Sequence, residues 1–154
     1  MRQARPADYD AIAAVVDAWW GRPILGTLPR LFLDHFWTTS LIAEAPDGGG
    51  RPDRLRGFLV GFLSPGAPDE AYIHFVGVAP EDRGSGLARS LYQAFFGTAR
   101  DGGRDVVRSI TSTVNQGSIA FHRAMGFSVT GPVFGYNGPG SEYMTFEYRL
   151  TSPS

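Results

Sequence analysis

The chain contains no cysteine and no lysine, and these two absences remove several kinds of chemistry. Without cysteine there is no disulfide, no thiolate nucleophile and no cysteine-ligated zinc site. Without lysine there is neither a Schiff-base amine nor the lysine that a Walker-type phosphate loop requires. Any reaction must therefore be carried by the other side chains and by the backbone.

The sequence also has little net charge and no long apolar run. The formal net charge is −1, which gives no general attraction to nucleic acid or to a membrane surface. The longest apolar stretch, residues 57–63, is far too short to span a bilayer, and the N-terminal residues lack the apolar core of a signal peptide. We therefore expect a cytoplasmic monomer or homodimer without nucleic-acid or membrane partners.

The 154 residues are enough for one domain with its own core. Apolar spacing and capping signals predict helices over residues 8–18, 29–36, 86–100 and 118–125. Strands are expected at residues 41–45, 56–63, 72–78, 106–111, 127–130 and 142–150. With a first N-terminal strand, the predicted order is β-α-α-β-β-β-α-β-α-β-β.

This order predicts a single mixed α/β domain over residues 1–150, followed by a tail at residues 151–154. Residues 46–53 are rich in Gly, Pro and Asp and are expected to form a hairpin loop. The strands at residues 56–63 and 72–78 are apolar at nearly every position, so we expect both faces of the sheet to be covered there.

A glycine-rich turn separates the strand at residues 72–78 from the following helix. Gly84 and Gly86 lack side chains, so a ligand could approach the backbone closely. Amide groups at a helix N-terminus, with the helix dipole behind them, favour phosphate, whereas a plain capped turn is the structural alternative. A dinucleotide fingerprint fails because Arg89 stands where its third glycine belongs.

Two motifs resemble one known family. The pattern Arg-x-x-Gly-x-Ala at residues 83–88 resembles the acyl-CoA motif of the GNAT superfamily of N-acetyltransferases. Residues 115–127, NQGSIAFHRAMGF, resemble that family's later asparagine–helix–Gly-Phe motif. The order of elements agrees as well, so the resemblance covers essentially the whole chain. It implies a mixed, mostly antiparallel, twisted sheet of about seven strands, splayed at its middle and flanked by about four helices.

The resemblance also implies an activity. We expect an acetyl-CoA-dependent N-acetyltransferase, without a metal, that transfers the acetyl group to a primary amine of a small molecule or peptide by direct attack. Two alternatives stay open. One is a noncatalytic acyl-CoA-binding sensor, and the other is a nucleotide-phosphate enzyme that uses the same glycine turn.

Cofactor-binding residues follow from the resemblance. The pantetheine arm is expected to pair with the backbone of Val76 and Val78. Gly77 between them suits a bulge or a close backbone approach, with tight strand packing as the alternative. Asn115 is expected to bond the pantetheine or the local backbone. The other expected cofactor residues are the pyrophosphate-binding turn and one helical aromatic residue: Arg83, Gly84, Ser85, Gly86, Leu87, Ala88 and Phe121.

Three side chains are candidates for proton transfer. Tyr72 and His74 share a strand face with Val76 and Val78 if side chains alternate regularly. His74 is the better candidate base because an ordinary imidazole has a pKa of about 6.5, although a core histidine bonded to a backbone carbonyl is the alternative. His122 stands where many relatives carry a tyrosine that acts as general acid. It is the candidate acid here, with a surface histidine as the alternative, and this departure gives some weight to the sensor alternative.

The acceptor pocket is expected from the segments that usually wall it in this fold. Aromatic walls with an arginine suit an amine that bears an apolar or carboxylate group, whereas core or interface packing is the alternative. His35 is in addition an outside candidate for the base. The residues in question are Trp19, Trp20, Arg22, His35, Trp37 and Tyr136.

Overall fold

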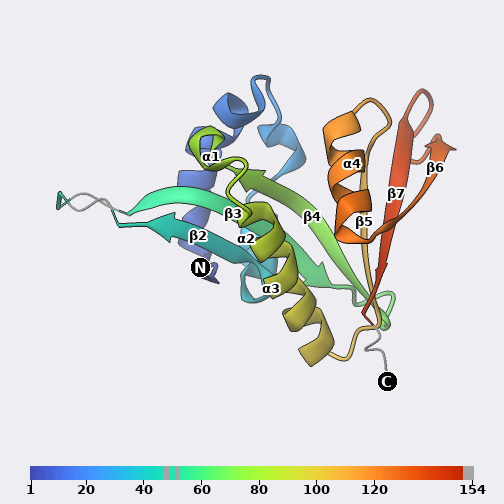
Figure 1. Cartoon of the computed structure of the whole chain (residues 1–154), viewed down its shortest axis with the longest axis horizontal. Coiled ribbons are helices and arrows are strands. Elements are labelled where there is room, and N and C mark those ends of the chain that lie inside the picture. Colours follow the sequence, from blue (N-terminus) through green and yellow to red (C-terminus); the bar gives the residue numbers. More distant parts are fainter. Residues whose placement is uncertain (47–48, 51–52, 151–154) are drawn as a thin grey trace. The chain divides into compact units, whose positions relative to one another are not determined.

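The computed structural model describes residues 1–46, 49–50 and 53–150 (Figure 1). Residues 47–48 and 51–52 of the predicted hairpin loop lie outside the described residues, as does the predicted tail at residues 151–154. The strands are β1 (Arg2–Gln3), β2 (Leu41–Ala45), β3 (Arg54–Leu63), β4 (Glu70–Val78), β5 (Val106–Ser112), β6 (Ser128–Phe134) and β7 (Glu142–Arg149). The α-helices are α1 (Tyr9–Trp20), α2 (Leu31–Phe36), α3 (Leu87–Asp101) and α4 (Gln116–Met125), and the short 3-10 helices are η1 (Pro6–Asp8), η2 (Leu25–Thr27), η3 (Trp37–Thr39) and η4 (Pro80–Asp82).

The strands form one mixed sheet. Among the described residues it has seven strands in the order β1-β2-β3-β4-β5-β7-β6. The pairs β1–β2, β2–β3, β5–β7 and β6–β7 are antiparallel, whereas β4 and β5 are parallel. With its four flanking α-helices, this architecture confirms the predicted fold class. The splay at the middle of the sheet stays a prediction.

The chain divides into two compact units, each assembled from two separate segments. The first unit contains the described residues of Met1–Phe62 together with His74–Thr98. The second contains Leu63–Ile73 and the described residues from Ala99 onward. Neither unit is continuous in sequence. The single domain over residues 1–150 stays a prediction. None of the helices within the described ranges is long and apolar enough to cross a bilayer.

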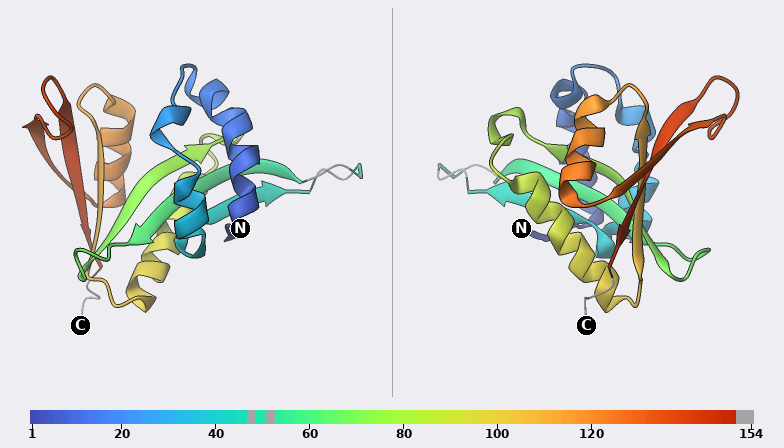
Figure 2. Two further views of the ribbon diagram at one scale, coloured as in Figure 1. Left: turned by 180° about the vertical axis from the view of Figure 1, so that it is seen from behind. Right: turned by 45° about the vertical axis from the view of Figure 1, so that its right-hand side comes forward.

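Both faces of β3 are covered in the first unit, as its unbroken apolar pattern predicts. Phe58 and Val60 belong to a buried cluster that includes Ile12 and Val16 of α1. On the other face, a Cβ atom added to Gly57 would lie 3.1 Å from Cδ2 of Leu87 and 3.4 Å from Cδ1 of Leu91, both in α3. The two views of Figure 2 show α1 and α3 on opposite sides of this part of the sheet.

Helix ends differ from the predicted ones for local reasons. The two tryptophans extend α1 to Trp20, and the helix stops at Gly21, which has a φ of 71° and donates its amide to the carbonyls of Asp17 and Ala18. At the other end, α4 begins two residues earlier than predicted because Asn115 caps it.

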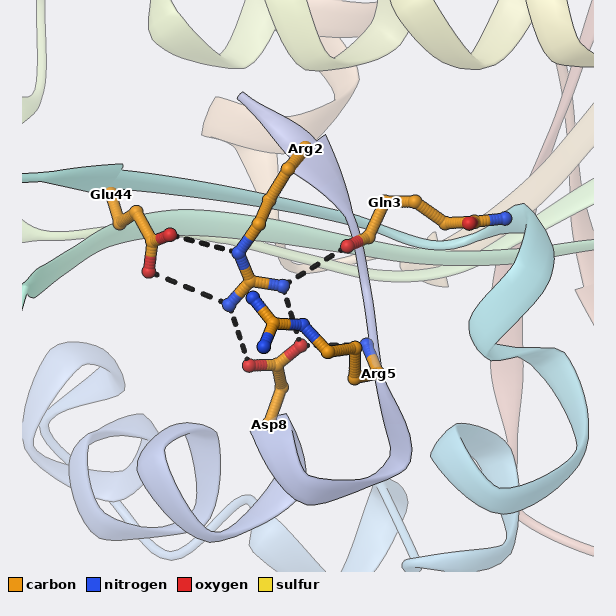
Figure 3. A network of polar contacts seen from close by, with 5 residues as sticks. All are labelled: Arg2, Gln3, Arg5, Asp8 and Glu44. Atoms are coloured by element: carbon orange, nitrogen blue, oxygen red, sulfur yellow. Dashed lines mark hydrogen bonds and ion pairs between the residues drawn. The ribbon is translucent and has the colours of Figure 1, made fainter.

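A polar network fixes the N-terminal end of α1 next to β2 (Figure 3). The guanidinium of Arg2 donates to both carboxylate oxygens of Asp8, at 2.8 and 2.9 Å, and to Oε1 of Glu44 at 2.8 Å. Asp8 also accepts from the amide of Arg5 at 2.7 Å. Burial on its own would raise the pKa of Asp8, but the hydrogen bonds from Arg2 and Arg5 outweigh it and lower that pKa.

Candidate active site

The glycine turn at the N-terminus of α3 has open space beside its backbone. Gly84 and Gly86 have φ values of 80° and 84°, in the left-handed region that favours glycine. Within the described chain, no atom beyond their neighbours in sequence lies within 4 Å of a Cβ placed on either residue. Because the first amides of a helix have no intrahelical acceptor, this turn offers the accessible N–H groups that a phosphate needs.

Asp82 holds this turn in place. Its carboxylate accepts from Nη1 of Arg54 at 2.9 Å and from Nε of Arg56 at 3.1 Å. The bond from Arg54, opposed by burial and assisted by Arg56, lowers the pKa of Asp82. The carbonyl of Asp82 accepts the amide of Ser85 at 3.3 Å. Asp82 was not predicted as a site residue from the sequence, although the acidic pair before the glycines signals it.

Arg83 connects the turn to the end of α1. Its guanidinium donates to the carbonyl of Trp19 at 2.6 Å, and its own amide donates to the carbonyl of Pro80 at 3.4 Å. The amides of Arg83 and Ser85 are therefore already engaged within the turn. Gly84, Gly86, Leu87 and Ala88 supply the remaining amides of the predicted pyrophosphate site.

Gly77 of β4 lies in close packing with aromatic side chains. A Cβ atom at this position would lie 2.6 and 2.9 Å from Cε1 and Cζ of Phe58, and 2.9 Å from Cη2 of Trp20. No other side chain fits without moving these rings, so tight packing accounts for this glycine. Val76 and Val78 on either side are half-buried.

His74 is half-buried and held from two directions. Its Nε2 lies 2.7 Å from the carbonyl of Thr27 in η2. Its ring stacks on Phe32 of α2, with a centroid distance of 3.9 Å and an interplanar angle of 3°. Burial lowers the pKa of His74, and the Thr27 carbonyl opposes that shift only in part. A lowered pKa favours the neutral ring, and in that form Nε2 has to carry the proton that it donates to the carbonyl of Thr27.

The strand departs from regular alternation at His74. Neighbouring side chains of a regular strand point to opposite faces. Here the rings of His74 and Phe75 are only 6.2 Å apart, and Phe75 packs against Trp20 of α1 at 4.8 Å while His74 contacts α2. Both side chains thus contact the segment that runs from α1 to α2, which is the behaviour expected of a bulged strand.

Tyr72, the other candidate on β4, lies in the second unit and is half-buried. Burial, followed by the proximity of Tyr136 and Tyr143, raises its pKa to about 12. At neutral pH the phenol therefore keeps its proton. It can donate that proton in a hydrogen bond but is a poor base.

His122 is buried in the second unit, with 4% of its surface exposed. Its Nδ1 lies 2.7 Å from the carbonyl of Ser118, four residues earlier in α4. The ring stacks on Phe146 of β7 at 3.9 Å and meets Phe127 edge-on at 5.0 Å. Burial lowers its pKa, opposed by the Ser118 carbonyl. The surface position considered in the sequence analysis is therefore wrong, and His122 packs among aromatic rings.

Asn115 and Phe121 of the asparagine motif contact residues close to them in sequence. Oδ1 of Asn115 accepts the amide of Ser118 at 3.1 Å and so caps α4. Phe121 is half-buried, with its ring 5.5 Å from that of His122. Of the two expectations for Asn115, the bond to the local backbone is present.

The predicted acceptor residues divide into packed and exposed side chains. Trp19 stacks on Phe58 at 6.1 Å, and Trp37 packs against the cluster of the first unit. Arg22 and His35 are exposed in that unit. In the second unit Tyr136 is 52% exposed, and its ring lies 5.9 Å from that of Tyr143, which the sequence analysis missed.

Comparison with known proteins assigns these features to a family. A model of the acetyltransferase (GNAT) family matches residues 12–127. The L-2,4-diaminobutyric acid acetyltransferase of Nocardia farcinica is 32% identical over 95 residues, which are 62% of this chain and 46% of that protein. The L-amino acid N-acyltransferase MnaT of Escherichia coli is 39% identical over 57 residues, which are 37% and 33% of the two chains. The chain thus matches less than half the length of these curated relatives.

A solved structure agrees in fold. The structure of yncA from Salmonella typhimurium, determined with its cofactor acetyl-CoA, has a TM-score of 0.70 at 20% identity. The match covers 99% of this chain and 94% of that one. The family match extends over both the glycine turn and the later asparagine motif, and it shows that this chain belongs to the GNAT family of acetyltransferases.

Proposed function

We propose that the protein is an acetyl-CoA-dependent N-acetyltransferase that acetylates a primary amine of a small molecule or peptide by direct attack. The observation that carries this proposal is the open glycine turn at Gly84 and Gly86, with unobstructed space beside the backbone at the N-terminus of α3. Membership of the GNAT family and the acetyl-CoA of the solved relative support it.

In this proposal the pyrophosphate of the cofactor binds the amides of Gly84, Gly86, Leu87 and Ala88. Asp82 keeps the turn in the required shape through its bonds to Arg54 and Arg56. The pantetheine arm pairs with the edge of β4 at Val76 and Val78. Asn115 and Phe121 stay proposed neighbours of the cofactor, and the contact of Asn115 with Ser118 supports a capping role for its side chain.

The reaction forms a C–N bond between the amine and the acetyl carbon and breaks the C–S bond of the thioester. An alkylamine has a pKa of about 10.4, so it must lose a proton before it attacks. Nδ1 of His74 accepts this proton, because that nitrogen is unprotonated in the neutral ring fixed by Thr27. The amide of Val78 stabilises the oxyanion, a role typically worth about 2.7–4 kcal/mol.

The departing CoA thiolate needs a proton. His122 was the candidate acid, and Tyr72 was considered beside His74 for the base; because the pKa of Tyr72 is raised to about 12, its phenol keeps a proton throughout the neutral range, and we propose it as the donor instead. The position of His122 among Phe127 and Phe146, with Nδ1 on a helix carbonyl, supports a structural role for that histidine instead.

An amino-acid amine is the first acceptor to test. Both curated relatives are named for amino-acid substrates, one for L-2,4-diaminobutyric acid and one for L-amino acids. The exposed Arg22 could bind an acceptor carboxylate, and Trp19, His35, Trp37 and Tyr136 remain proposed neighbours of the acceptor.

The test is the variant Gly86→Glu. A negative side chain at the phosphate position should abolish the thermal stabilisation by CoA, which at a ligand concentration of 100 Kd is about 2.7 kcal/mol for a competent site. Gly86→Ala controls for the strain of a Cβ at positive φ, and Gly66→Glu adds the same charge in open space elsewhere. Unchanged CoA stabilisation in Gly86→Glu would remove the glycine turn from the proposal.

Catalysis is tested separately by the release of free thiol from acetyl-CoA in the presence of a panel of amines and amino acids. Thiol release that depends on the amine is expected. CoA binding without thiol release over the whole panel would favour the sensor instead.

A further inference from the structure

We propose that Phe32 is a positioning residue for His74: its ring, together with the carbonyl of Thr27, fixes the imidazole so that Nδ1 is the atom presented as a base. This inference rests on the proposed function in taking His74 as the base. It adds the part of the chain that orients this base, the segment from η2 to α2, which neither the glycine motif nor the asparagine motif includes.

The geometry around the imidazole is specific. Two rings 3.9 Å apart and inclined by only 3° are in face-to-face contact, so Phe32 sets the plane of the imidazole. The bond from Nε2 to Thr27 sets the rotation of the ring within that plane. Together the two contacts leave the imidazole one orientation and one neutral tautomer, with the proton on Nε2.

The two partners come from a part of the sequence distant from His74. Thr27 is 47 residues earlier, and it lies in a short turn that is itself fixed by Oδ1 of Asp17, which accepts from the amides of Ile24 and Leu25 at 2.8 and 3.0 Å. The ring of Phe32 also lies 6.0 Å from that of Phe36 at an interplanar angle of 46°, a looser contact than its stack on His74. The base is therefore oriented by a preassembled segment of the first unit.

Charged groups are not needed to explain this arrangement. The causes of the lowered pKa of His74 are burial and, opposing it, the Thr27 carbonyl. The turn η2 carries no titratable side chain, and on α2 these are Asp34 and His35, both exposed. Asp17 of α1 is engaged with the two amides. The packing of Phe32 is thus the main factor that a substitution can alter.

The experiment compares Phe32→Leu with Phe36→Leu in the full-length protein. Both variants replace a phenylalanine of α2, but Phe36 stacks on Phe62 at 4.6 Å and is a matched control one turn away. Phe32→Tyr keeps the stack and serves as the conservative rescue, and Phe32→Met is a second unstacking variant should Phe32→Leu fail to fold. Melting curves establish that each variant is folded.

The first measurement is the nitrogen NMR spectrum of the histidines against pH, with His74 assigned through His74→Gln. In the wild type we expect the Nε2-protonated tautomer and a titration below the ordinary range. In Phe32→Leu the titration should move upward and the tautomers should mix, whereas Phe36→Leu and Phe32→Tyr should resemble the wild type. A His74 signal that titrates identically in Phe32→Leu and in the wild type overturns the positioning role.

The second measurement is kcat/KM against pH with the best amine of the panel. Loss of orientation should lower kcat about ten- to hundredfold without changing KM for acetyl-CoA. The acid limb of the profile should move upward together with the NMR titration, a readout that a merely structural residue would not affect. If the NMR titration moves and the acid limb does not follow it, Phe32 still positions His74, and the base assignment under the proposed function fails instead.

Discussion

His74 in the first unit and His122 in the second share two kinds of contact. Each ring has one nitrogen 2.7 Å from a backbone carbonyl, and each stacks on a phenylalanine at 3.9 Å. The difference lies in which nitrogen is used and how far the ring is buried. His74 uses Nε2 and is half-buried, whereas His122 uses Nδ1 and is 4% exposed.

A hydrogen bond to a carbonyl therefore does not by itself decide the role of a histidine. The carbonyl that faces His122 belongs to its own helix, four residues earlier, so the bond is local and the ring fills the core next to Phe127 and Phe146. The carbonyl that faces His74 comes from a distant turn, and the ring joins β4 to η2 through Nε2 and to α2 through its stack on Phe32. We therefore expect one histidine to affect mainly the rate and the other mainly the stability.

The largest expected effect is that of His74→Ala on the rate. Loss of a general base typically costs about 10²–10⁴-fold, so kcat/KM at neutral pH should fall by at least about a hundredfold. The loss should shrink as the pH rises toward the pKa of the amine, because the free amine then forms without help. Initial rates of thiol release from pH 6 to 10 test this; a constant ratio to the wild type across pH would contradict proton removal by His74.

His122→Ala should act next most strongly, and on stability. Removal of a buried ring that stacks on Phe146 leaves a cavity and should lower the free energy of unfolding by about 2–4 kcal/mol. His122→Phe keeps a ring at this place and should restore most of the loss in urea unfolding curves. If His122→Phe is folded but as slow as His74→Ala, the histidine acts in proton transfer after all.

The pH dependence of stability distinguishes the two histidines further. Both folded-state pKa values are lowered from the ordinary value of 6.5, so the unfolded chain binds more protons just below that pH. Stability is thus fully present above about 6.5 and is lost on acidification toward the folded-state values, by at most about 1.4 kcal/mol per pH unit for each ring. His122→Phe and His74→Gln should each flatten this slope in urea titrations between pH 7.5 and 5. A wild type that gains stability on acidification in this window would refute the sign.

The sequence predicted the elements well where the apolar spacing is regular. The strand Leu41–Ala45 was placed with its bounds, and α3 was displaced by only one residue, because its apolar side chains keep strict helical spacing. The glycine turn was also found, since two glycines between a strand and a helix are a local signal. Asp82 was missed because its role depends on Arg54 and Arg56, about 26 to 28 residues away.

Side-chain environments were harder to predict than elements. Regular alternation placed His74 on the face of Val76 and Val78, but the proximity of the His74 and Phe75 rings shows that alternation is interrupted there. The sequence also left His122 between a catalytic and a surface position, and neither anticipates its stack on Phe146. Such contacts depend on pairs of residues far apart in the chain, which composition and periodicity do not encode.

The smallest expected effect concerns the start of α4, on which the environment of His122 depends. Asn115→Ala removes the cap on the amide of Ser118 and should lower the free energy of unfolding by about 1 kcal/mol. The same residue, Ser118, faces His122 with its carbonyl. Asn115→Asp keeps the accepting oxygen and should retain the stability of the wild type, but it loses the amide donor. Calorimetry with CoA then separates the two expectations for this residue: a pure cap predicts unchanged affinity in Asn115→Asp, whereas a bond from the Asn115 amide to the pantetheine predicts weaker binding in a variant that melts like the wild type. In either case His74, in the other unit, should keep its titration.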